Sequence, residues 1–381
     1  MKKKKEKFAL VLGGGGARGA YEAGVWQALT ELGIEINIVT GTSVGSINGA
    51  MVCQGDLDLT LRMWKELETH MVFDLPEGSQ PIDYAKEIVL NKGVGSTRLK
   101  ELLEKYVDEE RIRNSSIDYG LVAVELKTLK PHFLFREDIK EGQIIDFILA
   151  SSSAFPAIHA HEIDGVEYID GGYGDIMPVD MAVEKGATKI VAVRLKTPGI
   201  EKYQFQKPKN VDITVIEPKW ELGNWLVFDV DNARKIMRLG YLEAMKEFGI
   251  FDGIYYSFAK ETFNKTDLKM ADACAKVFDM DPGIIYTKES FITKLSAIIQ
   301  QSDLEVNEAL TKVKHIRSKF ITLPDVVKSA KDAAKPYILC ILMAQNMKEK
   351  GAHSIFLNRA ATKIIPEAVY AAKFLVKYGL V

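Results

Sequence analysis

Four consecutive glycines near the N-terminus restrict the fold of this 381-residue chain more than any other feature. The run Gly13–Gly16 follows an apolar segment, Phe8–Leu12, and precedes an amphipathic stretch that begins near Ala20. Glycine lets the backbone turn sharply and leaves its N–H groups open to a negatively charged ligand. The order of strand, glycine loop and helix therefore predicts an α/β fold in which this loop binds an anion.

The first 218 residues alternate short β-branched runs with helical patterns. The predicted strands are FALVLG, INIVTG, YGLVAVEL, HFLFR, KIVAVRL and DITVIEP. Strands separated by helices form mostly parallel sheets that helices cover on both faces. One of these helices, STRLKELLEKYV, has Ser96 as its expected N-cap residue. We predict a three-layer α/β/α domain with a mostly parallel central sheet over residues 1–218.

After Pro218 the strand-like runs stop and helical patterns replace them. The segments with helical spacing are NARKIMRLGYLEAMKEFG, DLKMADACAKVFD, KESFITKLSAIIQQ, NEALTKVKHIRSKF and PEAVYAAKFLVKYGL. Residues 219–381 are therefore predicted to form a separate helical region, whose role as a lid, a dimer surface or a membrane-docking layer stays open. The stretch Met71–Gly95 has weaker periodicity and is either an excursion over a site or a plain connector.

Composition limits the classes of function. The chain is 47% hydrophobic and 27% charged with a formal net charge of -2, which is typical of a globular protein and gives no sign of nucleic-acid binding. The three cysteines fit no metal or redox spacing, so we expect reduced thiols in a cytoplasmic protein and no structural zinc. No apolar run approaches the roughly 20 residues of a membrane span. Lys2–Lys5 is either a contact with anionic lipid or a solvated tail.

The glycine loop has two interpretations. Gly14, Gly16 and Gly19 match G-x-G-x-x-G between a predicted strand and a predicted helix, as in dinucleotide-binding proteins. That fingerprint also needs an acidic residue near the end of the second strand, where this chain has Thr40 and Gly41. A nucleotide-binding oxidoreductase is therefore the weaker alternative, and the absence of G-K-[ST] excludes a P-loop.

The second predicted strand leads into a G-x-S-x-G motif, Gly41–Gly45. In a nucleophile elbow, small residues on both sides of the serine allow a strained turn that exposes its hydroxyl. The helix expected from Val44 to about Gln54 directs its positive end toward that hydroxyl. Ser43 is therefore the candidate nucleophile, with Gly41 and Gly45 as the elbow glycines.

A serine nucleophile needs a base for its proton. His159 and His161 are near the candidate site in sequence and could pair with a carboxylate or bind a metal, but without a third ligand we expect them to be structural or exposed. Asp170 ends a short predicted strand and is followed by Gly171 and Gly172. A tight glycine turn gives its carboxylate the fixed direction that a base needs, although Asp-Gly-Gly also forms ordinary hairpin turns.

Taken in order, GGGGARGAYEAGVWQALTE, GTSVGSINGA and DGG resemble the patatin-like phospholipases, lipid acyl hydrolases that use a Ser-Asp dyad and no histidine. The resemblance runs from about Phe8 to Leu195 and includes the segment Ala150–Val179, which in that family delivers the dyad aspartate. Two departures stand out. Many members carry asparagine where this chain has Asp175, and residues 219–381 contain no recognised functional motif.

The resemblance implies Ser43 as nucleophile, Asp170 as base and Gly14–Gly16 as the oxyanion loop. Arg18 and Gly19 are then expected to support that loop, with Arg18 bracing it or meeting a phosphate head group unless it is a plain surface cation.

The implied reaction is hydrolysis of a lipid or phospholipid acyl ester through an acyl-enzyme, without metal or cofactor. The pKa of an ordinary aspartate is about 3.9, so an apolar setting must raise it, and the nearest apolar residues in sequence are Phe155, Ile158 and Ile169. A peripheral membrane contact is compatible with this reaction, and the oligomeric state stays open. The remaining alternative is a non-catalytic lipid-binding protein on the same fold.

Overall fold

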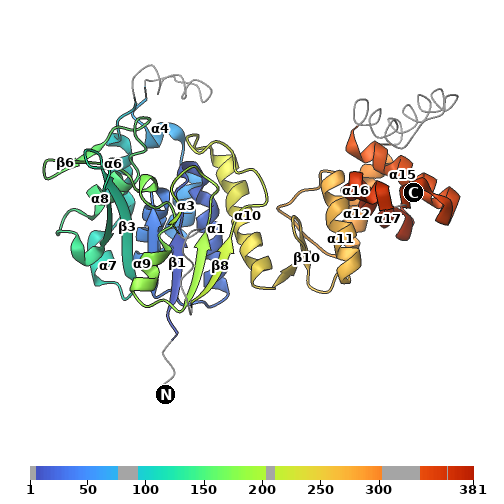
Figure 1. The fold of residues 1–381 in the computed structure, drawn as a ribbon, viewed down its shortest axis with the longest axis horizontal. Helices are drawn as coiled ribbons and strands as arrows, with labels where there is room; N and C mark the ends of the chain where they lie inside the picture. The colour runs from blue at the N-terminus through green and yellow to red at the C-terminus, as the bar shows by residue number, and fades with distance from the viewer. Residues whose placement is uncertain (1–5, 76–92, 203–210, 303–334, 358) are drawn as a thin grey trace. The chain divides into compact units, whose positions relative to one another are not determined.

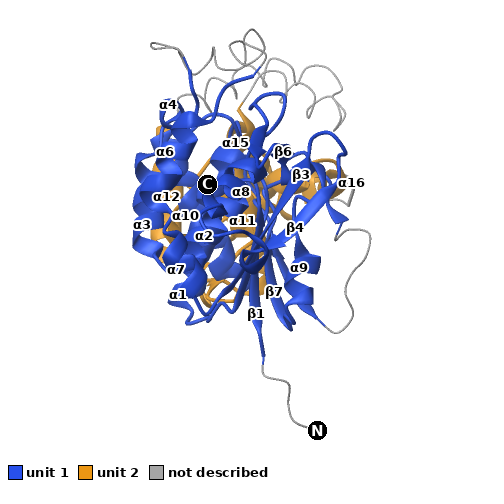
Figure 2. Ribbon diagram, turned by 90° about the vertical axis from the view of Figure 1, so that its left-hand side faces the viewer, with its two compact units in different colours: residues 1–247 blue, residues 248–381 orange. Residues whose placement is uncertain are grey.

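The computed structural model describes residues 6–75, 93–202, 211–302, 335–357 and 359–381. It divides into two compact units, Met1–Glu247 and Phe248–Val381 (Figures 1 and 2). Three segments discussed above lie outside the described residues: Lys2–Lys5, most of the Met71–Gly95 stretch, and the helix predicted over 307–320.

The first unit is built around a sheet of eight strands among the described residues, in the order β5-β6-β3-β2-β1-β7-β8, with β4 paired to β3. Their bounds are β1 (Phe8–Leu12), β2 (Ile38–Thr42), β3 (Asp118–Glu125), β4 (Pro131–Phe135), β5 (His161–Ile163), β6 (Val166–Asp170), β7 (Lys189–Val193) and β8 (Asp212–Ile216). Strands β3, β2, β1, β7 and β8 are parallel, and the other three are antiparallel. The six predicted strands are present, as is the short strand expected to end at Asp170, which is β6, whereas β5 was not predicted.

Helices cover both faces of this sheet. In Figure 2, α1 (Ala20–Glu31), α2 (Val44–Gln54), α3 (Leu57–Glu66) and α10 (Val230–Glu247) lie on one side and α9 (Val179–Glu184) lies on the other. Strands β1 and β2 are almost completely buried, as expected for parallel strands covered on both faces. On the α9 side, Ala9, Val11 and Ile190 of the sheet pack with Val179 and Ala182. The three-layer α/β/α prediction is confirmed.

The remaining helices of the first unit are α4 (Thr69–Val72), α6 (Thr97–Tyr106), α7 (Glu109–Asn114) and α8 (Ile144–Ser151). Helix α6 is the one whose cap was predicted. Ser96 occupies the N-cap position, but its side chain makes no capping hydrogen bond. The carboxylate of Asp74 accepts the Thr97 and Arg98 N–H groups instead, each at 3.0 Å. The predicted N-cap position is therefore confirmed, but the capping acceptor comes from a distant segment.

Helix α10 belongs to the first unit, although the sequence analysis assigned residues 219–247 to the C-terminal region. It crosses α1 so closely that a Cβ on Gly24 would lie 1.9 Å from the Met237 carbonyl oxygen, and a Cβ on Gly240 would lie 2.1 Å from that of Tyr21. The Tyr21 hydroxyl also donates to Glu243 at 2.5 Å. The units divide after Glu247 rather than at the predicted residue 218. Helical periodicity correctly indicated a helix here, but it does not show that this helix packs against α1.

The second unit combines helices with a small sheet (Figure 1). Its helices are α11 (Lys265–Val277), α12 (Lys288–Gln301), α15 (Pro336–Lys350), α16 (Arg359–Ile364) and α17 (Pro366–Lys377). Its strands are β9 (Phe251–Asp252), β10 (Ser257–Ala259) and β11 (Ile285–Tyr286), which are too short for an alternating pattern and contradict the prediction that strands end at Pro218. Among the helices of the described residues, none has the length and hydropathy needed to cross a bilayer.

Candidate active site

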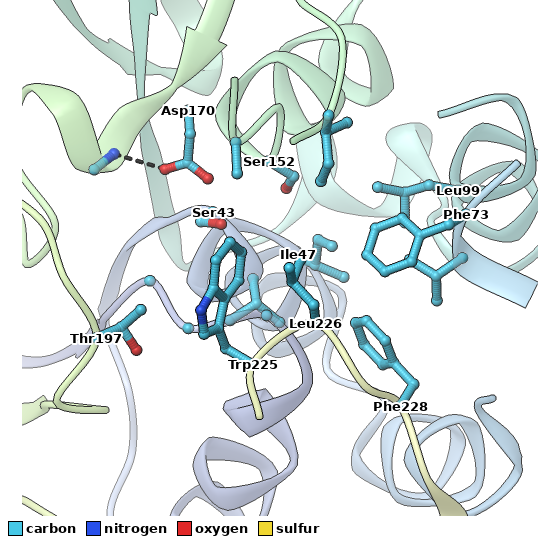
Figure 3. Close-up of a pocket in the computed structure, with 18 of the residues that line it drawn as sticks. Ser43, Ile47, Phe73, Leu99, Ser152, Asp170, Thr197, Trp225, Leu226 and Phe228 are labelled. Carbon is cyan, nitrogen blue, oxygen red and sulfur yellow. Dashed lines mark hydrogen bonds between the residues drawn. The ribbon is translucent and has the colours of Figure 1, made fainter. Parts of the chain in front are cut away.

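The sheet places the three sequence motifs close together. Strands β1 and β2 are parallel neighbours, so the glycine loop after Leu12 and the serine after Thr42 leave the same edge of the sheet. Strand β3 pairs Val122 with Thr42 on one side and Ala123 with Asp170 on the other. Figure 3 shows the Asp170 carboxylate directed toward Ser43.

Ser43 occupies a strained turn between β2 and α2. Its backbone has φ 56 and ψ -128, a conformation that costs free energy for a residue with a Cβ. The turn is so tight that a Cβ on Gly41 would lie 2.1 Å from the Gly45 carbonyl oxygen, and one on Gly45 would lie 2.3 Å from that of Leu12. Only glycine fits at both positions, which explains why the serine is flanked by glycines in the G-x-S-x-G pattern.

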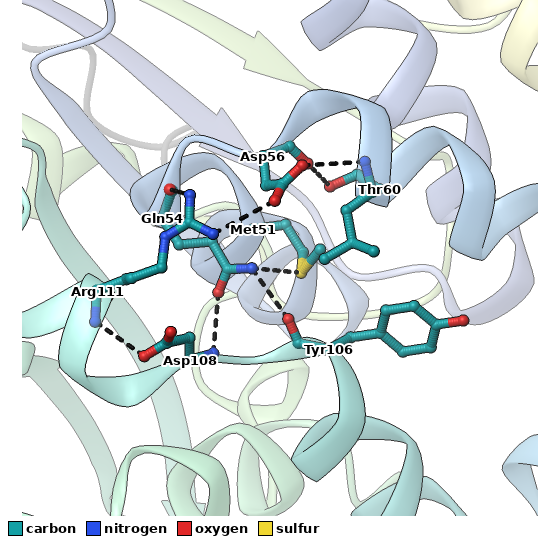
Figure 4. A network of polar contacts seen from close by, with 8 residues as sticks. Met51, Gln54, Asp56, Thr60, Tyr106, Asp108 and Arg111 are labelled. Carbon is teal, nitrogen blue, oxygen red and sulfur yellow. Dashed lines mark hydrogen bonds and ion pairs between the residues drawn. The ribbon is translucent and has the colours of Figure 1, made fainter.

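Hydrogen bonds hold this turn in place. The Ser43 N–H donates to Ser151 Oγ at 3.0 Å, and the Ser46 hydroxyl donates to the Ser43 carbonyl at 2.6 Å. At the other end of α2, the Gln54 side chain donates to the Tyr106 carbonyl at 2.9 Å, and the Gln54 backbone carbonyl accepts the Arg111 guanidinium at 2.7 Å (Figure 4). The helix that carries Ser43 at its N-terminus is therefore anchored at both ends.

Asp170 is a buried carboxylate at the end of β6. It is 8% exposed, its Oδ1 accepts the Gly172 N–H at 2.7 Å, and its own N–H donates to the Ser153 carbonyl at 2.8 Å. Burial raises its pKa to about 6, and the nearby Ser43 side chain and the hydrogen bond from the Gly172 N–H oppose that rise. The carboxylate therefore faces Ser43 and is more basic than an ordinary aspartate.

The turn after Asp170 is a short 3-10 turn, η3 (Gly171–Tyr173), and not a hairpin turn between two strands. Among the apolar residues expected to shield the carboxylate, Ile158 lines the same pocket and Ile169 is buried. Phe155 leaves 39% of its surface exposed. The desolvation of Asp170 thus comes from its place in the fold more than from the predicted Phe155.

The glycine loop offers two free backbone donors rather than three. The Gly14 N–H already donates to the Ile176 carbonyl at 3.1 Å, which removes Gly14 from the predicted set of oxyanion donors. The N–H groups of Gly15 and Gly16 make no hydrogen bond with a described residue. Gly16 has φ 53, and a Cβ there would lie 2.1 Å from the Trp225 carbonyl oxygen. The two glycines line the pocket that contains Ser43.

Arg18 braces the glycine loop. Its guanidinium donates to the Gly223 carbonyl at 2.9 and 3.0 Å and to the Lys196 carbonyl at 3.2 Å. It therefore joins the loop to two later segments, as the first of its three interpretations requires. Gly19, at the end of the 3-10 turn η1 (Gly16–Gly19), has its carbonyl bound by Asn48 at 3.0 Å.

Ser43 and Asp170 line a pocket of about 280 Å³ within the first unit (Figure 3). Its polar end contains Gly15, Gly16, Ser43, Ser152 and Asp170. The rest is mostly apolar and includes Ile47, Met63, Trp64, Leu67, Val72, Phe73, Leu99, Leu102, Ile158, Trp225, Leu226 and Phe228. Such a cavity accommodates a hydrocarbon chain with one end at the serine hydroxyl.

Sequence reasoning missed most of this lining. Trp225, Leu226 and Phe228 belong to the segment between β8 and α10, which was assigned to the C-terminal region. The cluster NWLVF between two charged stretches was the one available signal, because so many apolar residues in a connecting segment need a surface to cover.

Other candidate residues lie away from this pocket. His161 Nε2 is 3.0 Å from Asp146 Oδ1, in agreement with the structural role expected for it. Asp175 is 1% exposed and accepts the Met177 N–H at 3.2 Å, and burial raises its pKa to about 6. Within the described ranges, no group of three or more His, Cys, Asp or Glu side chains could hold a metal ion.

Comparison with known proteins gives a consistent result. Residues 10–183 match the sequence model of the family described as patatin-like phospholipase. "Patatin-like phospholipase domain-containing protein 7" of Rattus norvegicus is 27% identical over 49% of this chain and 13% of the rat protein. "Lysophospholipase NTE1" of Debaryomyces hansenii is 30% identical over 49% of this chain and 12% of the yeast protein.

These curated relatives are much longer than this chain, and the match spans only 13% and 12% of their lengths. Among solved structures, VipD from Legionella pneumophila aligns with 99% of this chain and 92% of its own, at 14% identity and a TM-score of 0.44. The family match covers the end of β1, the glycine loop, the serine elbow and the Asp170 turn. The first unit of this chain therefore carries a domain of the patatin-like phospholipase family.

Proposed function

We propose that this chain is a serine hydrolase that cleaves acyl esters of lipids through Ser43 and Asp170. The observation that carries the proposal is a buried carboxylate of raised pKa that faces a serine in a strained turn, at the polar end of an apolar pocket. A strained nucleophile, a basic partner and a dry cavity are the components that acyl transfer needs.

The geometry supports the following reaction. Asp170 accepts the proton of the Ser43 hydroxyl as its oxygen attacks the ester carbonyl carbon. The carbonyl oxygen becomes an oxyanion, which the N–H groups of Gly15 and Gly16 stabilise. Collapse of this intermediate expels the alcohol, which takes the proton from Asp170. Water then attacks the acyl-enzyme by the same route and releases the fatty acid.

The lining of the pocket supports a fatty acyl group as the part of the substrate that is bound. Trp64, Phe73 and Phe228 offer aromatic surface but no charge to a head group. We therefore assign an activity of the phospholipase A, lysophospholipase or esterase type. The same lining disfavours a nucleotide-binding oxidoreductase, because a dinucleotide beside Gly16 would need polar partners in place of these rings.

We further propose that the second unit contacts membrane surfaces. Lys and Arg outnumber Asp and Glu in residues 248–381, although the whole chain has 50 basic and 52 acidic residues. Ile355, Leu357 and Ile364 are 47%, 39% and 52% exposed in a stretch that also exposes Lys350 and Lys363. Exposed apolar side chains among lysines favour an anionic lipid surface. The free thiols of all three cysteines support a cytoplasmic location.

Activity measurements on two variants test the hydrolase proposal. Ser43→Ala and Asp170→Asn should each lower the hydrolysis of phospholipid and short-chain esters by at least about 10³-fold, because each removes a group that acts in the bond-forming step. Ser290→Ala and Asp231→Asn, which lie outside the pocket, are the matched controls. Near-normal activity in either dyad variant would overturn the proposal. Binding to lipid vesicles without hydrolysis by the wild-type protein would support the non-catalytic alternative.

A further inference from the structure

Three consecutive serines end helix α8 beside the dyad, and two of them have clear structural roles. Ser151 Oγ accepts the Ser43 N–H at 3.0 Å. The Ser153 carbonyl accepts the Asp170 N–H at 2.8 Å, and the Ser153 hydroxyl donates to the Leu149 carbonyl at 2.9 Å. The end of α8 thus fixes the backbone of both dyad residues.

The middle serine has no such role. Ser152 is 7% exposed, and its Oγ is buried without a hydrogen bond to any described residue. The side chain lines the pocket, and Figure 3 shows it beside Asp170 on the way to the apolar end. A buried hydroxyl without a partner is unfavourable, and such groups in native structures need an explanation.

Three other polar side chains of the pocket are already engaged. Thr197 Oγ1 donates to the Leu195 carbonyl at 3.5 Å, and the Tyr173 hydroxyl donates to the Phe155 carbonyl. Asp170 accepts the Gly172 N–H at 2.7 Å. A substrate that presented only hydrocarbon to Ser152 would leave its hydroxyl unpaired. Because Ser152 lies next to Ser43 and Asp170, the substrate atom nearest to its hydroxyl must belong to the region around the scissile ester.

We propose that the Ser152 hydroxyl binds an oxygen atom on the alcohol side of the scissile ester, carried by the carbon next to the one that bears the ester oxygen. This inference rests on the proposed hydrolase function and adds a substrate-binding residue to it. In a glycerolipid, the neighbouring glycerol carbon carries a hydroxyl or a second ester oxygen, so the Ser152 contact selects a glycerol ester over the ester of a simple alcohol. The same contact orients the leaving group before Asp170 returns its proton.

A pair of substrates isolates this contact. The first is a 1-acyl glycerophosphocholine with a free hydroxyl at the second carbon, and the second is its 2-deoxy analogue with the same acyl chain. Ser152→Ala should lower kcat/KM about tenfold for the hydroxyl substrate and less than about twofold for the deoxy analogue, because only the first can use the contact. The control is Ser257→Ala, which removes another buried and unpartnered hydroxyl, but in the second unit.

The outcomes separate the two proposals. Equal losses for both substrates, or no loss for either, would overturn the role of Ser152 while leaving the hydrolase function intact. If wild-type protein hydrolyses neither substrate nor any other acyl ester, the proposed function fails and the Ser152 contact fails with it. An unchanged melting temperature of Ser152→Ala shows that its effect does not come from unfolding.

Discussion

The two ends of the pocket are built in different ways. At the polar end, backbone contacts fix Ser43 and Asp170, as in the turn where Gly41 and Gly45 admit no side chain and Ser43 is strained. At the apolar end, ring packing fixes the wall. Phe228 stacks on Trp64 with centroids 6.2 Å apart and meets Phe73 edge-on at 5.8 Å. The first end should therefore determine the rate of the chemical step and the second the choice of acyl chain.

The largest effect should follow from a methyl group at the polar end. In Gly16→Ala, the new Cβ would lie 2.1 Å from the Trp225 carbonyl oxygen at a positive φ, so the loop must move and its donors leave the oxyanion. We expect a loss of about 10²–10³ in kcat, the size seen when oxyanion donors are removed. The control is Gly33→Ala, which also has a positive φ but no atom within 4 Å of the new Cβ. Similar kcat values for the two variants would contradict the claim that the polar end of the pocket determines the rate of the chemical step.

The next largest effect is that of pH on the polar end. Asp170 acts as a base only when ionised, and burial raises its pKa to about 6. Below about pH 6, kcat/KM should fall about tenfold per pH unit, and above it the value should level off. A pH–rate profile with a short-chain ester measures this. A profile that stays flat down to about pH 4 would show that Asp170 is not the base.

A smaller effect is expected at the apolar end. Phe228→Ala removes both ring contacts and enlarges the cavity, so KM for a long-chain ester should rise about tenfold while kcat for a short-chain ester stays within about twofold. Phe278→Ala breaks a stacked pair with Tyr337 in the second unit and is the control for lost stability. A fall in kcat for short and long esters alike would mean that the two ends are not separable.

The smallest effect concerns stability near the polar end. Burial raises the pKa of Asp175 to about 6, so the folded state binds its proton more tightly than the unfolded state does. The free energy of unfolding should therefore decline as pH rises from about 4 to about 6 and then level off. Asp175→Asn should remove a part of this decline on the order of 1–3 kcal/mol. Urea unfolding across this pH range measures it, with exposed Asp231→Asn as a control that should keep the full decline.

What the sequence could predict follows the same division. The Ser43 elbow and the extent of α2 could be predicted because a turn without room for a Cβ requires glycines at fixed spacing. The short strand ending at Asp170 could be predicted because glycine is likewise required directly after it, at Gly171. The catalytic roles of these residues stay predictions.

Long-range contacts explain what the sequence could not predict. The Gly14 N–H is taken by Ile176, and the oxygen that caps α6 comes from Asp74. Phe228 closes the pocket because α10 crosses α1, a packing that helical periodicity does not encode. The unpartnered state of Ser152 is likewise visible only once its neighbours are in place.

Labelling with a fluorophosphonate probe tests the central claim most directly, because such probes react with activated serine hydroxyls. We expect one label per wild-type chain, located on Ser43 by peptide mass analysis. Labelling of Asp170→Asn should be slower, and Ser43→Ala should take up no label. A folded wild-type protein that takes up no probe, or that carries the label on another serine, would contradict the Ser43–Asp170 dyad.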